Sequence, residues 1–134
     1  YLGPGEESRY MKICINMMIG TSMQMMAESL VLGEKAGLDW VSMVDCICDS
    51  AAASPIIKAK QEMFSKREFA PMCTGYTLEK DLGIALSLGQ KHGITLPITG
   101  ISKQNYSAMK SHQIADKDYA AILYVNEIMN GIDH

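Results

Sequence analysis

Hydrophobic residues dominate the first quarter of the chain without leaving a clean polar face. Over residues 6–37 they recur at helical spacing, and over residues 10–20 they surround almost the whole circumference of a helix. Gly37 suits the left-handed residue that ends a helix. The pattern predicts one long helix that ends at Lys35 or Ala36. Its apolar first half is expected to be buried on all sides, between other helices or between subunits.

Five shorter helices are predicted after the first. Asp39 and Ser54 precede apolar-periodic residues and are good helix caps, and Pro55 suits a first helical turn. Gly93 and Gly131 suit helix ends. The predicted helices cover residues 40–49, 54–64, 77–92, 97–111 and a last stretch from 116 or 118 to 129. With no repeat and no hairpin signal, the chain is predicted to be all-α, with about six helices led by one long N-terminal helix.

Composition narrows the function classes. The chain has 134 residues, of which 48% are hydrophobic and 20% charged, as expected for one globular domain. The net charge of -3 provides no basic surface for nucleic acid, so no nucleic-acid partner is expected. No stretch reaches the roughly 18 uncharged apolar residues of a membrane span, so no membrane partner is expected either.

The four cysteines form no recognisable metal or redox motif. Only Cys46 and Cys48 are close, and C-x-C within a helical pattern is neither a zinc knuckle nor a redox C-x-x-C. Scattered cysteines in apolar surroundings are typical of small buried residues in a reducing compartment, so a cytoplasmic location is expected. The histidines and cysteines lack metal-ligand spacing, and no metal site is predicted.

Lys12 and Asn16 are the best candidates for chemistry. They lie four residues apart inside the apolar run, so a helix places them on one face. On one interpretation Lys12 reaches water from a buried helix and Asn16 bonds a neighbouring backbone. On the other, Lys12 is a general acid and base and Asn16 orients a substrate, because burial brings the pKa of a lysine closer to neutral. Gly20, one turn further, leaves the face bare for a ligand or another backbone.

Three further groups of residues carry weaker signals. Lys80 and Asp81 are expected in the first turn of a helix, either as an exposed pair or with Lys80 offering positive charge to an anionic ligand. A methionine series is expected to be core or subunit contact rather than a ligand box. The series comprises Met17, Met18, Met23, Met25 and Met26. A face of mixed charge is expected to be solvated, and it comprises Lys58, Lys60, Glu62, Lys66, Arg67 and Glu68.

Three segments resemble a known enzyme family. Two of them, G-P-G-E-E-S-R-Y-M-K-I-C-I-N-M-M at residues 3–18 and A-E-S-L-V-L-G-E-K-A-G-L-D at residues 27–39, resemble the start of the C-terminal domain of β-hydroxyacid dehydrogenases. That family includes 3-hydroxyisobutyrate dehydrogenase and 2-hydroxy-3-oxopropionate (tartronate semialdehyde) reductase. The third, Y-T-L-E-K-D-L-G-I-A-L-S-L-G-Q-K-H-G-I-T-L-P at residues 76–97, is similar to the family's K-D-L stretch and following proline. The resemblance covers essentially the whole chain and implies an architecture like the C-terminal domain of 6-phosphogluconate dehydrogenase.

The resemblance implies roles for three residues. Lys12 would be the catalytic lysine, Asn16 would bind substrate, and Lys80 would approach the cofactor, which is NAD or NADP. The implied reaction is reversible oxidation of a short β-hydroxyacid of the 3-hydroxyisobutyrate or tartronate semialdehyde type. Hydride would pass to C4 of the nicotinamide while Lys12 takes the hydroxyl proton. The all-round apolar first helix adds the expectation of a homo-oligomer, a dimer or a tetramer.

The chain departs from the family pattern in two ways. The pattern G-x-x-G-x-G-x-x-x-K matches at Gly3 and Lys12 but has Glu6 and Ser8 where glycines are usual, which affects close substrate approach at this turn. The family's N-terminal Rossmann domain, which binds most of the cofactor, is absent from these residues, so the chain alone is expected to be inactive. Two alternatives are a non-catalytic helical oligomerisation or interaction module and an imine-reductase-like domain. The presence of Lys12 disfavours both.

Overall fold

The regular elements of the chain are helical. The computed structural model describes residue 1 and residues 3–133, and in this part no strand forms beyond one isolated bridge between Thr74 and Asp118. The elements are α1 (Glu7–Lys35), α2 (Trp40–Cys48), α3 (Pro55–Ala59), α4 (Gln61–Lys66), α5 (Gly75–Lys91), α6 (Pro97–Ser111), the 3-10 turn η1 (Tyr119–Ala121) and α7 (Ile122–Met129). The predicted all-α class with one long leading helix is confirmed.

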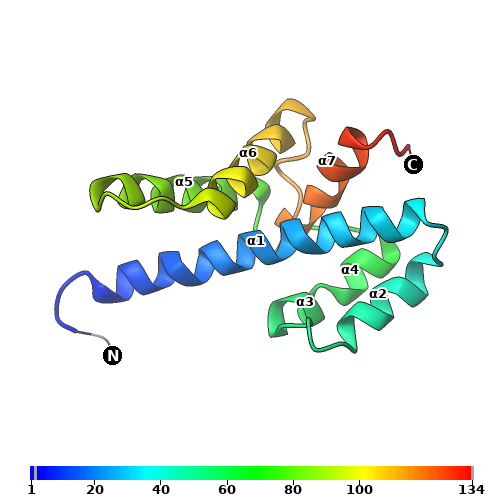
Figure 1. The fold of residues 1–134 in the computed structure, drawn as a ribbon, viewed down its shortest axis with the longest axis horizontal. Coiled ribbons are helices and arrows are strands. Elements are labelled where there is room, and N and C mark those ends of the chain that lie inside the picture. The colour runs from blue at the N-terminus through cyan, green and yellow to red at the C-terminus, as the bar shows by residue number, and fades with distance from the viewer. Residues whose placement is uncertain (2, 134) are drawn as a thin grey trace.

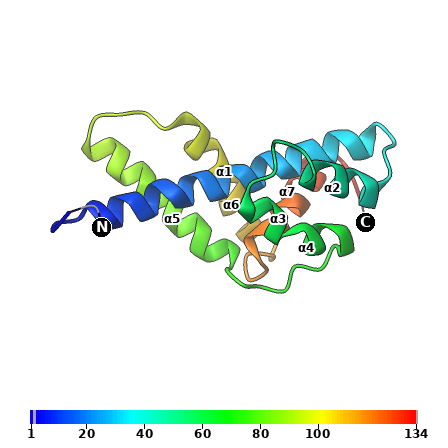
Figure 2. The same ribbon diagram turned by 90° about the horizontal axis from the view of Figure 1, so that it is seen from below.

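Helix α1 is the axis of the molecule. Helices α5, α6 and α7 pack along one side of it, and α2 with α3 and α4 lies on the other side of its C-terminal half (Figure 1). Seen from below, the N-terminal half of α1 lies in front of α5, while the C-terminal half runs beside α2 and α3 (Figure 2). The two halves of α1 therefore have different surroundings.

Local signals set several helix ends as predicted. The Asp39 carboxylate accepts a hydrogen bond from the backbone N–H of Ser42 at 3.0 Å, which caps α2. The Ser54 hydroxyl accepts from the N–H of Ile57 at 3.3 Å and caps α3. Gly37 has a φ of 88°, a conformation that strongly favours glycine, directly after α1.

Other boundaries were predicted wrongly because tertiary contacts decide them. Helix α5 begins at Gly75 rather than at Thr77, since the N–H of Gly75 donates to the carbonyl of Lys117 at 3.0 Å and Thr74 serves as the cap. The helix expected over residues 54–64 is interrupted at Lys60 and forms α3 and α4. The last helix begins as the 3-10 turn η1 after the cap Asp118.

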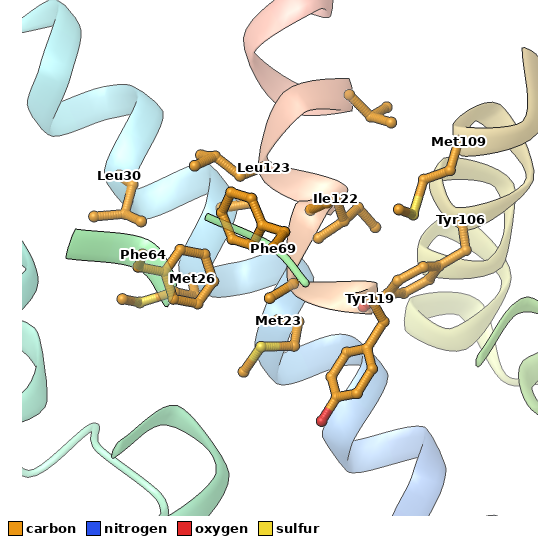
Figure 3. Packing of buried hydrophobic residues seen from close by; sticks show 14 of the residues in the cluster. Met23, Met26, Leu30, Phe64, Phe69, Tyr106, Met109, Tyr119, Ile122 and Leu123 are labelled. Carbon is orange, nitrogen blue, oxygen red and sulfur yellow. The ribbon is translucent and has the colours of Figure 1, made fainter. Parts of the chain in front are cut away.

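The core lies where the C-terminal half of α1 meets the other helices. Side chains from α1, α4, α6, η1 and α7 converge there together with Phe69 (Figure 3). Phe69 packs edge-on against both Phe64 and Tyr124, with ring centroids 5.7 and 5.2 Å apart. The buried members labelled in Figure 3 are Met23, Met26, Leu30, Phe64, Phe69, Tyr106, Met109, Tyr119, Ile122 and Leu123. The chain thus buries an apolar core of its own.

The other helices of the chain do not bury the first half of α1 on all sides, so that part of the prediction is wrong, and burial between subunits stays a prediction. Ile13 and Gly20 are buried, but Met18 is 71% exposed. The methionine series is divided in the same way, since Met23 and Met26 are core residues while Met25 is exposed. An all-round apolar pattern shows that residues avoid water, but it does not show what covers them.

Gly20 is a helix-packing position. A Cβ there would lie 3.2 Å from the nearest side-chain carbon of Leu82, so α5 approaches α1 closely at this point. The Gly20 carbonyl also accepts a hydrogen bond from the buried Tyr106 hydroxyl at 3.0 Å. The face of Gly20 is therefore filled by α5 and α6 and is not left bare for a ligand.

The mixed-charge face is not uniformly solvated, and Lys60 is its first exception. Lys60 is 3% exposed, and its ammonium donates to the Asp118 carboxylate at 2.8 Å while lying 4.5 Å from the ring centroid of Tyr119. The same carboxylate accepts from the backbone N–H groups of Met72 and Cys73 at 3.1 and 3.4 Å. Asp118 therefore joins the α3–α4 junction to the segment that leads into α5.

Arg67 is the second exception to the predicted solvated face. Its guanidinium lies 3.8 Å from the ring centroid of Trp40 and donates to both carboxylate oxygens of Glu127 at 3.1 and 2.9 Å. A further bond of 3.3 Å reaches Glu34 on α1. Arg67 thus connects α1, α2 and α7, which a reading of its local sequence could not show.

Burial of Tyr119 in η1 is expected to lower the stability of the fold at alkaline pH. Desolvation, reinforced by the Asp118 charge, raises the pKa of Tyr119 to about 12 from the ordinary 10.0. The contribution of Tyr119 to stability is therefore complete below pH 10.0 and is lost as the pH rises through about 12. We expect Tyr119→Phe to remove a late phenol ionisation from an ultraviolet titration, whereas Phe at the exposed Tyr76 should leave that step in place. An unchanged titration of the Tyr119 variant would contradict this expectation.

Candidate functional site

Lys12 and Asn16 line one shallow hollow on the N-terminal half of α1. The hollow is open to solvent and is bordered on the same helix by Ser8, Met11 and Ile15. Helical spacing places the ammonium and the carboxamide one turn apart, as expected from the sequence. An apolar wall beside two polar groups is suited to a small, partly charged molecule.

Lys12 is exposed in this chain. The expectation that it is buried among Met and Ile side chains is therefore wrong here, because the apolar residues around it are themselves exposed. Met11 is 43% exposed and Ile15 is 50% exposed. Water reaches the ammonium freely unless another surface covers this part of α1.

Asn16 is held by a contact that the sequence did not reveal. Its side-chain amide donates to the carboxylate of Asp81 on α5 at 2.9 Å, and both residues are half-buried. Asp81 lies in the second turn of α5, not in the first, so the predicted exposed first-turn pair is wrong for this residue. The two positions are 65 residues apart, and the sequence holds no local signal that links them.

Lys80 is exposed beside this contact. It directly precedes Asp81 on α5, so the bond from Asn16 brings the K-D-L segment up to α1. Within the described part of the chain, neither Lys12 nor Lys80 forms an ion pair with a carboxylate. The structure thus presents two solvated ammonium groups, one on α1 and one on α5, and the hydrogen bond from Asn16 to Asp81 joins the same two helices.

A second bridge holds the start of α1 against the end of α5. The hydroxyl of Tyr10 lies 3.1 Å from Nε2 of His92, and the two rings meet edge-on with centroids 5.7 Å apart. Tyr10, Asn16 and the Gly20 backbone therefore all connect α1 to the α5–α6 pair. These bridges fix the orientation of the helix face that carries Lys12.

The arrangement suits binding of an anion more than binding of a metal or a pyrophosphate. Ammonium and amide groups donate hydrogen bonds to carboxylates. Among the described residues no group of three His, Cys, Asp or Glu side chains could hold a metal ion. The N–H groups of Gly75 and Tyr76 donate to the carbonyls of Lys117 and Ala115, so the first turn of α5 is not a phosphate cradle.

In the part of the chain that the structure describes, even the 29-residue α1 lacks the length of uninterrupted apolar sequence needed to cross a bilayer.

The chain is similar in sequence to several known proteins. A family model described as NAD-binding of NADP-dependent 3-hydroxyisobutyrate dehydrogenase matches residues 7–126. Glyoxylate/succinic semialdehyde reductase 1 of Arabidopsis thaliana is 28% identical over 123 residues, covering 92% of this chain and 43% of the relative. The 2-(hydroxymethyl)glutarate dehydrogenase of Eubacterium barkeri is 34% identical over 122 residues, covering 90% of this chain and 40% of the relative.

A solved structure supports the same fold. The crystal structure of 3-hydroxyisobutyrate dehydrogenase from Salmonella typhimurium superposes with a TM-score of 0.85 at 20% identity, over 91% of this chain and 42% of that one. The chain thus spans about two-fifths of the length of the proteins it matches.

The fold and the matches define the class of protein. It is that of the NAD(P)-dependent β-hydroxyacid dehydrogenases. More closely, the chain belongs to the 3-hydroxyisobutyrate dehydrogenase family. The resemblance seen in the sequence is thereby confirmed. The roles of Lys12, Asn16 and Lys80 stay predictions.

Proposed function

We propose that this chain forms the helical C-terminal part of an oxidoreductase that acts on a short β-hydroxyacid with NAD or NADP. The observation that carries the proposal is the shared hollow of Lys12 and Asn16, with Asn16 bonded to Asp81 at 2.9 Å. An ammonium beside an oriented hydrogen-bond donor supports the proposal, because oxidation of an alcohol needs a group that takes the hydroxyl proton and a group that orients the substrate. Substrates of the 3-hydroxyisobutyrate or tartronate semialdehyde type fit this chemistry.

Lys12 has the proton-transfer role in this proposal. When bound, the nicotinamide supplies hydride chemistry. In the oxidative direction the amine form of Lys12 accepts the hydroxyl proton of the substrate as its carbon loses hydride, so that a carbonyl forms. In the reductive direction the ammonium form returns the proton to the developing alkoxide. Asn16 donates a hydrogen bond that orients the substrate, since its carboxamide is already aligned by Asp81.

A second domain must complete the site for this chemistry to run. Lys12 is exposed in the helical part, and covering it would remove water and bring a lysine closer to proton transfer near neutral pH. We assign this cover to a Rossmann domain that binds most of the cofactor, with Lys80 reaching toward the nucleotide. The whole protein is proposed to act as a homo-oligomer. The 134-residue chain alone is expected to be inactive.

The proposal is tested by joining the chain to a nucleotide-binding domain. The full-length product, or a fusion to the Rossmann domain of a relative, is assayed with NAD and NADP against 3-hydroxyisobutyrate, tartronate semialdehyde, glyoxylate and succinic semialdehyde. We expect turnover of at least one of these, and none from the isolated 134 residues. A folded two-domain protein without turnover of any short hydroxyacid or its carbonyl partner would favour the non-catalytic interaction module, which the exposed apolar residues of α1 also suit.

The Asn16–Asp81 bond makes a separate prediction for substrate binding. Asp81→Ala removes the acceptor that orients Asn16, and we expect KM for the hydroxyacid to rise about tenfold with a smaller change in kcat. Asp81→Asn is the matched control, since its carbonyl oxygen still accepts from the Asn16 amide. It should stay within about threefold of the parent enzyme. Equal losses in both variants would show that the charge of Asp81, not its bond to Asn16, is what matters.

A further inference from the structure

The start of α1 has no capping side chain of its own. Glu6 takes the N-cap position, but its carboxylate accepts no hydrogen bond from the first turn. A helix end without such a cap leaves its first N–H groups to water and frays easily. Glu7 accepts a hydrogen bond from the N–H of Gly5 at 2.7 Å, and Arg9 pairs with Glu6 at 3.5 Å. These contacts stay within residues 5–9, so they do not tie the start of α1 to the rest of the fold.

Tyr10 is the first residue of α1 in the described part of the chain that bonds to a distant segment. Its hydroxyl lies 3.1 Å from Nε2 of His92, and the two rings meet edge-on with centroids 5.7 Å apart. His92 follows the last residue of α5 and sits on a well-fixed backbone. The N–H of Ile94 donates to the carbonyl of Gly89 at 2.9 Å, and Gly93 takes the left-handed conformation with a φ of 66°. The Tyr10 ring therefore meets a partner that is itself held in place.

Lys12 lies between two polar bridges from α1 to the α5 side. Tyr10 is two residues before it, and Asn16, which donates to Asp81 at 2.9 Å, is four residues after it. Ile13 directly follows Lys12 and is 7% exposed, so this turn is also packed on its inner side. A turn held at both ends keeps its backbone, and with it the origin of the Lys12 side chain, in one position. Loss of the Tyr10 contact would leave the uncapped end of the turn unsupported.

We propose that Tyr10 and His92 are positioning residues for the proton-transfer step assigned to Lys12. Neither lines the hollow of Lys12, so both act through the backbone of α1 and not on the substrate. The inference rests on the proposed function, because it concerns the same lysine. A general acid or base must lie within hydrogen-bond reach of the reacting oxygen, and a misplacement of about 1 Å costs on the order of 10²-fold in rate. The Tyr10–His92 pair keeps the Lys12 turn within that reach.

A double-mutant cycle in the two-domain enzyme tests the proposal. We expect Tyr10→Ala to lower kcat about tenfold without changing KM for the nucleotide. Tyr10→Phe should fall between this variant and the parent, because it keeps the edge-on ring contact. In the Lys12→Ala background, Tyr10→Ala should lower kcat no further, since Tyr10 acts through Lys12. Lys91→Ala is the matched control, because Lys91 is exposed directly beside His92, and it should keep the parent rate.

Backbone hydrogen exchange gives a readout that does not depend on turnover. In the Tyr10→Ala protein the amides of residues 11–14 should exchange about tenfold faster than in the parent, whereas those of residues 23–31 in the core should not change. Exchanging the partners, with Tyr10→His and His92→Tyr together, places the same two groups across the contact. This double variant should recover most of the lost rate and of the lost protection.

Three results would overturn the positioning role. The first is an unchanged kcat of Tyr10→Ala in an enzyme that Lys12→Ala disables. The second is an equal loss from Tyr10→Ala with and without Lys12, which would make the contact structural only. The third is unchanged amide exchange over residues 11–14. A Lys12→Ala enzyme at the parent rate would instead remove the catalytic assignment itself, and the positioning role with it, so the two failures are distinguishable.

Discussion

Alanine at Lys12 is expected to lower kcat of the two-domain enzyme by about 10²- to 10⁴-fold, the usual contribution of a positioned general acid or base. The ammonium of Lys12 lies in the hollow that also holds Asn16, and within the described part of the chain it has no carboxylate partner that would make it a structural ion pair. Because the side chain is exposed, its removal should leave the fold of the helical domain intact. The loss would then fall on turnover and not on protein yield or melting temperature.

Two further variants, Lys12→Arg and Lys80→Ala, distinguish a role of Lys12 in proton transfer from a role of positive charge in binding. Lys12→Arg keeps the positive charge but does not release a proton at neutral pH, so we expect KM to change little while kcat falls nearly as far as in the alanine variant. Lys80→Ala should instead raise KM for the cofactor, since Lys80 is proposed to reach the nucleotide. The measurement is a set of steady-state rates over a range of pH for the three variants. A Lys12→Ala enzyme within twofold of the parent would refute the catalytic assignment.

Local signals made much of the fold predictable. Asp39, Ser54 and Gly37 act through bonds or dihedral angles within three or four residues of themselves, so the chain segment around each contains all the relevant information. The start of α5 was misplaced for the opposite reason. Its first N–H groups bond to Ala115 and Lys117, some forty residues away, and this contact determines where the helix begins.

The polar residues show the limit of prediction most clearly. Lys60 and Arg67 looked like members of a solvated face, because their partners Asp118 and Glu127 lie 58 and 60 residues away. In the same way, the bond from Asn16 to Asp81 spans 65 residues. A charge pattern indicates which residues are polar, but pairing across the fold decides which of them are buried. The helical spacing of Lys12 and Asn16, by contrast, is local and was available from the sequence.

The largest expected effect on stability comes from Asp118. Its carboxylate is fully buried and accepts from the Lys60 ammonium and from the backbone N–H groups of Met72, Cys73 and Ala120. Asp118→Ala would leave a buried ammonium and these N–H groups without their acceptor. We expect the free energy of unfolding to fall by about 3–5 kcal/mol, a large part of the stability of a domain this size. Urea unfolding followed by circular dichroism measures this change directly.

Variants of Lys60 and Asp118 show how much of the lost stability comes from the unpaired charge and how much comes from the lost bonds to backbone N–H groups. Lys60→Met removes the ammonium but leaves the Asp118 carboxylate bonded to the N–H groups of the loop, so its destabilisation should be smaller than that of Asp118→Ala. Asp118→Asn should fall between them, because its carbonyl still accepts from part of the set. The double variant Lys60→Met with Asp118→Ala should be less destabilised than the sum of the single changes, since each single change leaves a buried charge unpaired and the second change removes that charge. A change below about 1 kcal/mol for Asp118→Ala would contradict this account of the buried pair.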